Sequence, residues 1–369
     1  MKTITRVLLA VLVAVAGTTA ATSTAASAAQ LPGFVLTSSA AALPAELAPL
    51  ATGKRIQYVS TNVNGSLTTA TGLVLTPKTG KKNKIVAWGH GTTGLADKCA
   101  PSTNQGVFWP EARVAVAELL SRGWTVAAPD YPGLGTALPH PYLVGASEGR
   151  SLIDSVKAAR NLDAALSTQY AIDGHSQGGQ GSLFASQLAP SYDGNLVLKG
   201  TASIAPLSNA DVLAPLIPGS PAQGYLVMAL YGINAVEPAF QPFTYLAPQA
   251  EAKVGVLQTG CLYEILDAYD ELTAAQLLTG GTVHPTIISK FRQYLNPGRT
   301  SPSAPVLIVH GTADQDVPFF LSEDYLVPQL KKDYPSIPVK FVPLEGATHD
   351  SAVIESADLV ADWIAARFA

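Results

Sequence analysis

Short runs of apolar residues alternate along most of the chain with segments that are apolar only at helical spacing. The runs predict buried strands just before Ser176 and at 84–88, 124–128, 196–205, 305–311 and 339–344. The other segments predict helices from Ser147 onward, after Ser176 and at 111–121, 321–332 and 352–368. Apolar strands that alternate with helices are typical of a parallel sheet covered on both faces, so we predict an α/β fold.

Two regions depart from this alternation. Residues 55–60 and 70–75 predict an antiparallel pair of strands, with turn residues at 62–66, and the Pro- and Ala-rich residues before them predict no element. From about 207 to 302 the strand pattern stops, and proline-punctuated apolar segments indicate a mainly helical insertion. The most periodic of these segments are 225–236 and 261–278.

The N-terminus predicts export. Lys2 and Arg6 precede an apolar run and a small-residue tract, which together indicate a secretory signal peptide. This run is too short to span a bilayer, and no later run approaches about 18 apolar residues, so we expect no stable membrane insertion. The predicted division is a signal peptide at 1–29, a core in two parts at 30–206 and 303–369, and a helical cap insertion at 207–302.

Composition narrows the possible partners. The 369 residues include 23 basic and 27 acidic side chains, and the signal peptide carries two of the basic ones, so the exported chain has a net charge of −6. A mildly acidic chain without basic runs is a poor candidate for binding nucleic acid. Cys99 and Cys261 are the only cysteines, and in an oxidising compartment such a pair predicts a disulfide. Without clustered histidines they make a poor zinc site, so we expect no metal.

The clearest candidate for chemistry is a Gly-x-Ser-x-Gly pattern centred on Ser176, between a strand end and a helix start. A sharp turn there needs small residues two positions before and after the serine, where Gly174 and Gly178 stand. The turn exposes the hydroxyl, and the following helix directs free N–H groups towards the group that it attacks. We predict that Ser176 is a nucleophile.

The same pattern occurs around Ser147, between Gly145 and Gly149. Pro139 and Pro141 before it are unsuited to a central strand, and residues at helical spacing follow it. We therefore predict that Ser147 is a helix N-cap and not a nucleophile.

Two later strand ends supply an acid and a base. Asp314 and His349 each follow a predicted strand, and reactive loops gather beyond the carboxyl ends of strands in open α/β sheets. We predict that His349 takes the proton of Ser176 and that Asp314 holds the tautomer of His349. Asp316 stays open as an alternative acid.

A nucleophilic serine also needs N–H donors for the developing oxyanion. Gln177 follows the serine and Thr92 lies just beyond the strand at 84–88, so we assign the oxyanion hole to their backbone N–H groups, with Thr93 as an alternative. A Gly-rich loop that serves only a tight turn would use the same residues. We interpret His175 and His310 as packing or hydrogen-bonding residues, and we assign no role to His140 and His284.

Four motifs together resemble the α/β-hydrolase superfamily: GHGT at 89–92, GHSQGG at 174–179, HGTAD at 310–314 and TH at 348–349. The helical insertion and the signal peptide make the chain similar to the secretory lipase family, the group of Candida antarctica lipase A. This resemblance implies an α/β-hydrolase fold with an inserted helical cap, and a secreted serine hydrolase that cleaves small-molecule or lipid carboxylic esters without a cofactor. We expect a monomer.

Two other functional classes stay open. A non-catalytic binding protein on a hydrolase scaffold would have no need of a complete triad. A serine peptidase or aminopeptidase of the same fold would bind a peptide N-terminus through acidic residues of the insertion. The candidates are Glu237, Glu251, Glu264, Asp267, Asp270 and Glu271. The insertion also has many apolar side chains, and an apolar lining above Ser176 would favour medium-chain acyl groups.

Overall fold

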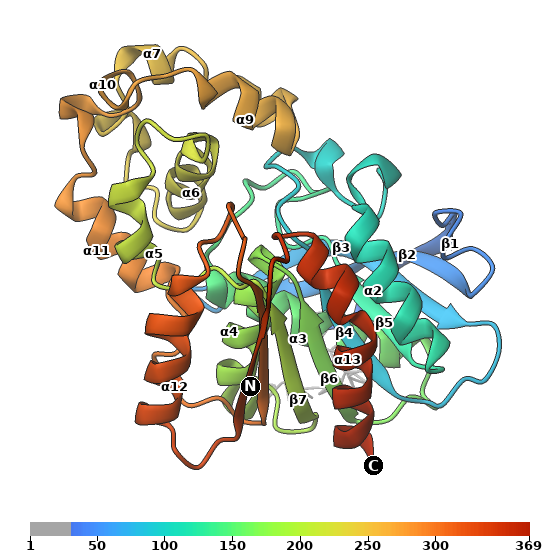
Figure 1. Ribbon diagram of the computed structural model, residues 1–369. Coiled ribbons are helices and arrows are strands. Elements are labelled where there is room, and N and C mark those ends of the chain that lie inside the picture. The colour runs from blue at the N-terminus through green and yellow to red at the C-terminus, as the bar shows by residue number, and fades with distance from the viewer. Residues whose placement is uncertain (1–30) are drawn as a thin grey trace, which may run out of the picture.

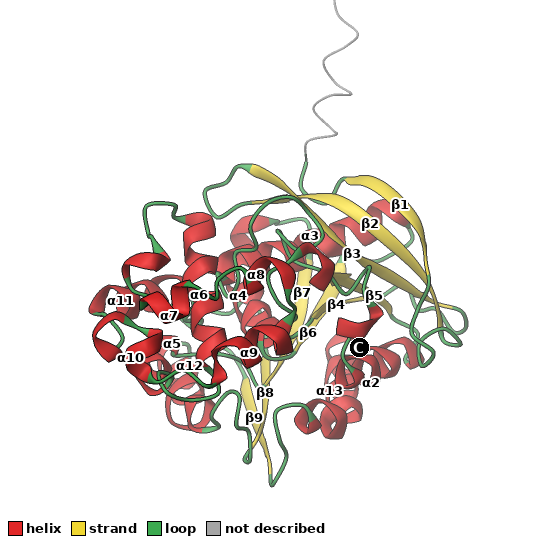
Figure 2. Ribbon diagram, turned by 90° about the horizontal axis from the view of Figure 1, so that it is seen from above, coloured by secondary structure: helices red, strands yellow, loops and turns green. Residues whose placement is uncertain are grey.

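The computed structural model describes residues 31–369, so the predicted signal peptide lies outside the described residues. One sheet runs through it in the order β1-β2-β3-β5-β4-β6-β7-β8-β9. The strands are β1 (Val35–Ala41), β2 (Ala51–Thr61), β3 (Leu67–Pro77), β4 (Ile85–Gly89), β5 (Thr125–Pro129), β6 (Gln169–Gly174), β7 (Val197–Ile204), β8 (Val306–Gly311) and β9 (Val339–Leu344). Helices cover both faces, and a further group of helices lies above the sheet in Figure 1 and to its left in Figure 2. The predicted α/β fold is confirmed.

The sheet has an antiparallel edge and a parallel body. β1, β2, β3 and β5 pair antiparallel, whereas β5, β4 and β6 to β9 pair parallel. The predicted pair at 55–60 and 70–75 lies within β2 and β3, with Ile56 opposite Gly72. β1 was not predicted, because its first and last residues are only half-buried and those between them are exposed. Without an alternating apolar signal, only its pairing with β2 defines this edge strand.

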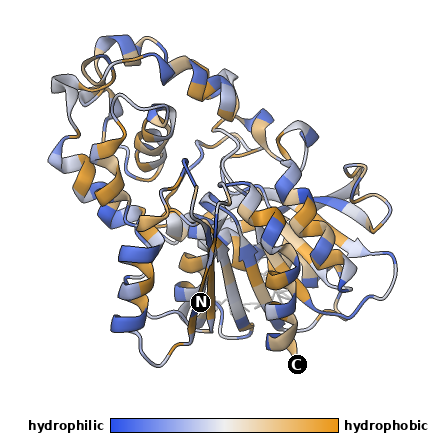
Figure 3. Cartoon of the chain, in the orientation of Figure 1, coloured by the Kyte–Doolittle hydropathy of each residue, from blue (hydrophilic) through white to orange (hydrophobic). Residues whose placement is uncertain are grey.

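The helices of the two outer layers are α2 (Pro110–Ser121), α3 (Gly145–Leu162), α4 (Gln177–Tyr192), α12 (Val327–Asp333) and α13 (Ser351–Phe368). In β4, Val86 and Trp88 pack in one core with α2 and α13, whereas Ile85 and Ala87 pack in another with α3 and α4. Figure 3 shows the apolar residues of the strands and of the helices on both sides. Burial on both faces explains why these strands are apolar throughout.

The chain between β7 and β8, called here the helical insertion, contains helices and no strand. They are α5 (Ala210–Leu213), α6 (Gln223–Val236), α7 (Pro248–Glu251), α8 (Val256–Thr259), α9 (Leu262–Asp270), α10 (Ala274–Leu277) and α11 (Pro285–Tyr294). The insertion has its own hydrophobic core around α6. The periodic segment 261–278 forms two helices, because a capping box at Thr273 starts α10. The proposed domain boundaries stay a prediction. No helix within 31–369 is long and apolar enough to cross a membrane.

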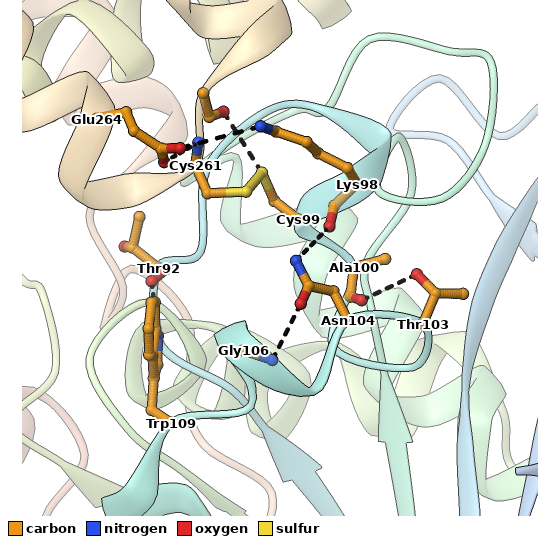
Figure 4. Close-up of a disulfide and its surroundings, with 11 residues drawn as sticks. Thr92, Lys98, Cys99, Ala100, Thr103, Asn104, Gly106, Trp109, Cys261 and Glu264 are labelled. Carbon is orange, nitrogen blue, oxygen red and sulfur yellow. Dashed lines mark hydrogen bonds and ion pairs between the residues drawn. A yellow bond between two sulfur atoms is a disulfide. The ribbon is translucent and has the colours of Figure 1, made fainter. Parts of the chain in front are cut away.

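A disulfide joins the helical insertion to the loop after β4. Cys99 ends a short 3-10 turn and Cys261 precedes α9, and their Cα atoms are 5.6 Å apart. Figure 4 shows the bridge with the neighbouring ion pair between Lys98 and Glu264 at 4.0 Å. The N–H of Leu262 also donates to Thr93 O at 2.9 Å. The insertion is therefore attached beside the end of β4 both covalently and by hydrogen bonds.

We predict that the double substitution Cys99→Ser with Cys261→Ser lowers the free energy of unfolding by about 3–5 kcal/mol. The bridge closes a loop with a sequence separation of 162 residues, and its removal returns conformational entropy to the unfolded chain. Urea unfolding of the oxidised wild type and of the variant measures the difference. Two alkylatable thiols in the unreduced wild type would contradict the bridge.

Candidate active site

Ser176 lies at a sharp turn between β6 and α4. Its backbone angles are φ 56° and ψ −117°, a conformation that costs a non-glycine residue about 1–3 kcal/mol. The N–H of His175 donates to Gly89 O at 3.1 Å, and the N–H of Ser176 donates to Ile204 O at 2.9 Å. These carbonyls end β4 and β7, so the two neighbouring strands hold the strained serine in position.

Two glycines permit this turn. A Cβ at Gly174 would lie 2.3 Å from Gly178 O, and a Cβ at Gly178 would lie 2.0 Å from Gly89 O. Any side chain at either position would therefore force α4 away from β6 or β4. The small residues of the sequence pattern are explained by this close approach of three backbone segments.

The predicted N-cap role of Ser147 is wrong. The N-cap of α3 is Val144, and Ser147 lies inside the first helical turn. Its side chain is buried, and its Oγ has no hydrogen-bond partner within residues 31–369. The helix starts earlier, since the Val144 carbonyl accepts from the N–H groups of Ser147 and Glu148, and the Glu148 carboxyl group accepts from Leu143 N–H at 3.0 Å just before the helix.

Asp314 and His349 meet beyond the ends of β8 and β9. His349 Nδ1 lies 2.7 Å from Asp314 Oδ2, and both side chains are buried. Asp314 Oδ1 accepts hydrogen bonds from the backbone N–H groups of Asp316 and Val317, each at 2.9 Å. His310 Nε2 lies 3.2 Å from Asp314 Oδ2, in accord with its interpretation as a hydrogen-bonding residue. The loop after β8 thus holds the carboxylate of Asp314 towards His349.

Hydrogen bonds decide the ionisation of this pair. Burial alone would raise the pKa of Asp314, but hydrogen bonds from His310 and His349 outweigh it and keep the pKa well below its usual range. Burial alone would lower the pKa of His349, but the hydrogen bond and the charge of Asp314 raise it. Because ionised Asp314 accepts from Nδ1–H of His349, Nε2 is left without a proton and can act as a base.

Ser176 and His349 line one cavity, although no hydrogen bond joins their side chains in the described part of the chain. Such bonds are often long in enzymes without substrate and tighten when substrate binds. Asp316, the alternative acid, is exposed, and its Oδ1 accepts a hydrogen bond from Tyr225 OH of α6 at 3.3 Å. The contacts favour Asp314 over Asp316 as the partner of His349.

Thr92 and Gln177 each have a backbone N–H without an acceptor among residues 31–369. The Thr92 carbonyl accepts from Trp109 Nε1 at 3.0 Å, as Figure 4 shows, and its hydroxyl lies 2.8 Å from Tyr142 OH. Gln177 begins α4, where free N–H groups create a partial positive charge. Thr92 and Gln177 line a cavity together with Ser176, whereas the fully buried Thr93 does not. The geometry favours Thr92 over Thr93 as the second donor.

A buried polar network behind Gln177 was missed in the sequence. Gln177 Nε2 donates to Glu148 Oε1 at 2.8 Å and to His140 Nε2 at 3.2 Å. His140 Nδ1–H donates to Pro132 O at 2.8 Å, which leaves its Nε2 as an acceptor. Burial raises the pKa of Glu148 to about 8 and lowers the pKa of His140 to about 3, so both are mainly neutral at pH 7. This network fixes the side chain of Gln177, which follows Ser176 directly.

His284, the other histidine without a predicted role, caps α11.

Two cavities meet at Ser176, Thr92, Tyr225 and Asp316. The first, called here the apolar cavity, has walls from the helical insertion that include Leu207, Leu213, Ile217, Leu226 and Phe291. The second, called here the polar cavity, is lined by His349 and by Trp109, Glu111, His175, Tyr263 and Asp350. Ser176 therefore faces two spaces of different chemical character.

Two groups of three side chains in the described chain have metal-ligating atoms within 4.8 Å of one another. One comprises Asp314, Asp316 and His349, in which the hydrogen bond between Asp314 and His349 already engages two of the residues. The other comprises Glu111, His175 and Asp350 in the polar cavity. The expectation that the protein holds no metal stays a prediction.

We predict that Glu148→Gln removes a pH-dependent loss of stability. Burial raises the pKa of Glu148 from 4.5 to about 8, so the folded protein binds this proton more tightly than the unfolded chain does. The resulting stabilisation is full below about pH 4.5 and is lost as the pH rises to about 8. In urea unfolding at about pH 5 and about pH 8.5, the variant should therefore gain stability relative to wild type at the higher pH. A difference between the two proteins that is independent of pH would contradict this assignment.

Solved structures show the same fold. The structure of Candida antarctica lipase A in its closed state matches this chain with a TM-score of 0.77 and 21% identity, over 92% of this chain and 82% of that chain. The rice cell wall degrading esterase LipA from Xanthomonas oryzae matches with a TM-score of 0.72 and 20% identity over 90% of this chain and 99% of that chain. At these identities the likeness establishes the α/β-hydrolase fold alone.

Sequence relatives narrow the family. A secreted triacylglycerol lipase of Malassezia globosa is 26% identical over 70% of this chain and 59% of its own length. Lipase 7 of Candida albicans is 27% identical over 67% of this chain and 58% of its own length. The matches therefore span less than two thirds of either relative. The profile of the family described as Secretory lipase matches residues 101–369, most of the chain. The resemblance noted in the sequence is confirmed, and the chain belongs to the secretory lipase family.

Proposed function

We propose that this protein is a secreted serine hydrolase that cleaves carboxylic esters through an acyl-enzyme on Ser176. The observation that carries the proposal is the strained Ser176 turn, which shares a cavity with the hydrogen-bonded pair of Asp314 and His349. Family membership and the named lipases among its relatives support ester hydrolysis. Two observations support export. Residues 1–29 have the basic and apolar pattern of a signal peptide, and the chain belongs to the secretory lipase family.

In the proposed reaction, His349 Nε2 takes the proton of Ser176 as Oγ attacks the ester carbonyl. The carbonyl oxygen becomes an oxyanion that accepts hydrogen bonds from the N–H groups of Thr92 and Gln177. The tetrahedral intermediate then loses the alcohol, to which His349 returns the proton. Water, activated by His349 in the same way, releases the acid and regenerates Ser176.

Asp314 has two roles in this scheme. Its hydrogen bond to Nδ1 of His349 selects the tautomer that presents Nε2 as the base. Its charge stabilises the imidazolium that forms when His349 holds the proton. Because Asp314 accepts further hydrogen bonds from Asp316 and Val317, it stays ionised while buried.

The apolar cavity is the proposed acyl site. It contains the two candidate oxyanion donors together with Ser176, and its other walls are mainly apolar side chains, leucine and alanine above all. An acyl chain entering from the carbonyl carbon would lie against these walls, and each buried methylene contributes about 0.8 kcal/mol. We therefore propose a preference for medium-chain over acetyl esters.

The aminopeptidase alternative has less support. The six acidic residues of the helical insertion that kept it open line neither cavity at Ser176. Glu237 forms an ion pair with Lys290 at 2.6 Å, and Glu264 accepts a hydrogen bond from Cys261 N–H at 2.8 Å. These two acids have structural partners in the insertion, and the absence of all six from the two cavities favours an ester substrate over a peptide N-terminus.

We predict that Ser176→Ala lowers kcat on p-nitrophenyl esters by a factor on the order of 10⁶, because the variant lacks the nucleophile. In wild type, kcat/KM should rise from acetate to octanoate, and aminoacyl nitroanilides should be poor substrates. Ser147→Ala is the matched control and should keep most of the activity, since its hydroxyl lies inside α3. Faster cleavage of the nitroanilides, or full activity of Ser176→Ala, would contradict the proposed function.

We predict that Asp314→Asn lowers kcat by roughly 10⁴, because an amide leaves His349 in the wrong tautomer. Asp316→Asn makes the same chemical change two residues away and should cost less than about tenfold, since Asp316 has no hydrogen bond to His349 among the described contacts. Steady-state kinetics on one ester compares the two variants. The reverse order of losses would make Asp316 the acid.

A further inference from the structure

The polar cavity contains a cluster of hydrogen-bond acceptors that the proposed triad does not use. Glu111 comes from the first turn of α2, His175 from the residue before the nucleophile, and Asp350 from the N-cap of α13. One ligand atom of each lies within 4.8 Å of the others. Segments far apart in the sequence therefore direct three polar groups into one corner of the cavity.

Glu111 is buried without a partner that would explain its burial. The residue is only 5% exposed, and apart from its own backbone N–H its carboxyl group has no ion-pair or hydrogen-bond partner within 31–369. A buried carboxyl group without such a partner is costly, and this one lines the cavity beside Ser176. Burial accordingly raises the pKa of Glu111 to about 7. The structure thus holds an acidic group in a position where a cation would stabilise its ionised form.

His175 adds an acceptor to this corner and no positive charge. Its Nε2–H donates to His349 O at 3.2 Å, which leaves Nδ1 unprotonated in the neutral ring. Burial keeps the pKa of His175 well below its usual range, so the ring stays neutral. When Glu111 and Asp350 are ionised, these three residues therefore offer acceptors only.

The other charges around the cluster leave the cavity negative. Asp316 also lines the cavity, and His349 is the basic group that faces Glu111 from the loop before α13. Arg113, on the same helix as Glu111, donates to Phe108 O at 2.7 Å and to Glu46 Oε1 at 3.2 Å. Its ion pair is with Glu46, and within residues 31–369 it forms none with Glu111 or Asp350.

Aromatic rings form another wall of the cavity. Trp109 and Tyr263 contact edge to face with centroids 5.4 Å apart, and Tyr225 lines the same space. The hydrogen bond from Trp109 to Thr92 O holds the indole beside the nucleophile. Carboxylates beside aromatic rings attract organic cations through charge and through the negative faces of the rings. A metal ion would gain little from these rings, so the lining favours an organic cation.

The position of the cavity assigns this cation to one half of the substrate. If the apolar cavity holds the acyl chain, the alcohol must occupy the other space at Ser176, where His349 returns the proton. We infer that the polar cavity binds the cationic group of an amino alcohol, so that the preferred substrates are esters of choline-type alcohols. This inference rests on the proposed ester hydrolysis. The acyl–oxygen bond breaks, the alcohol leaves with the proton from His349, and water supplies the oxygen of the acid.

A pair of isosteric substrates tests the inference. Butyrylcholine and 3,3-dimethylbutyl butyrate share acyl chain and shape, and only the first is charged. We expect kcat/KM at pH 8 to be higher for the choline ester by about tenfold, the order of effect of a partly desolvated cation on carboxylates and aromatic rings. The ratio of the two kcat/KM values, choline ester over neutral ester, should fall at pH 6, because Glu111, with its pKa of about 7, becomes protonated. Protonation of His349 removes the base for both esters, so it lowers both kcat/KM values by the same factor and leaves their ratio unchanged. EDTA in the buffer removes competing metal ions.

Three variants locate the effect. Glu111→Gln and Asp350→Asn should each lower the ratio towards one, and the first should also remove its pH dependence. Asp350 is exposed, so its variant tests the site even if the buried Glu111 variant folds poorly. Glu355→Gln, an exposed acid on α13 outside the cavity, is the matched control and should leave the ratio unchanged.

The outcomes separate this inference from the proposed function. A ratio that falls in both cavity variants and not in Glu355→Gln supports a cationic alcohol site. A wild-type ratio near or below one, or a ratio that both variants keep, overturns the site while hydrolysis of the neutral ester still supports an esterase. If folded wild type cleaves neither ester, the proposed function fails and the inference fails with it.

Discussion

The rest of the site depends on the strained backbone at Ser176. A non-glycine residue with φ 56° is stable only where its surroundings leave no alternative, and here β4 and β7 bind the turn through Gly89 and Ile204. Contact between the backbones at Gly174, Gly178 and Gly89 leaves no room for a side chain. The same turn aims the serine hydroxyl at the cavity and starts α4 beside it. The packing energy of the central sheet therefore maintains a conformation that the isolated sequence would not adopt.

Hydrogen bonding determines which buried acids near this turn carry charge. Asp314 receives hydrogen bonds from two backbone N–H groups and from His349, so its pKa lies below the usual range. Glu148 receives fewer, and burial raises its pKa to about 8. One oxygen of Asp173 in β6 has no hydrogen-bond partner among residues 31–369, and burial raises the pKa of Asp173 to about 7. Hydrogen bonds thus keep the pKa of buried Asp314 low, whereas burial dominates at Glu148 and Asp173 and raises theirs.

The helical insertion supplies much of the apolar wall beside Ser176. The sheet supplies Ser176 and the loops of Asp314 and His349, whereas much of the apolar cavity comes from α5, α6 and α11. The bridge between Cys99 and Cys261 and the hydrogen bond between Tyr225 and Asp316 attach this insertion to the strand ends. The proposed catalytic residues and the proposed acyl-binding walls therefore come from different parts of the chain, and their relative position depends on a few specific contacts.

The sequence alone determined the features that arise from local pattern and chain order. Apolar strands that alternate with helices predicted the parallel sheet, and the glycines around Ser176 predicted its turn, because both follow from constraints within a few residues. The edge strand β1, the true N-cap of α3 and the division of 261–278 into α9 and α10 were missed, since pairing and side-chain partners define them. Only the tertiary structure brought Glu148 behind Gln177, and Glu111 beside His175 and Asp350. These contacts join residues from separate elements, and no pattern along a single sequence records the distances at which folding brings them together.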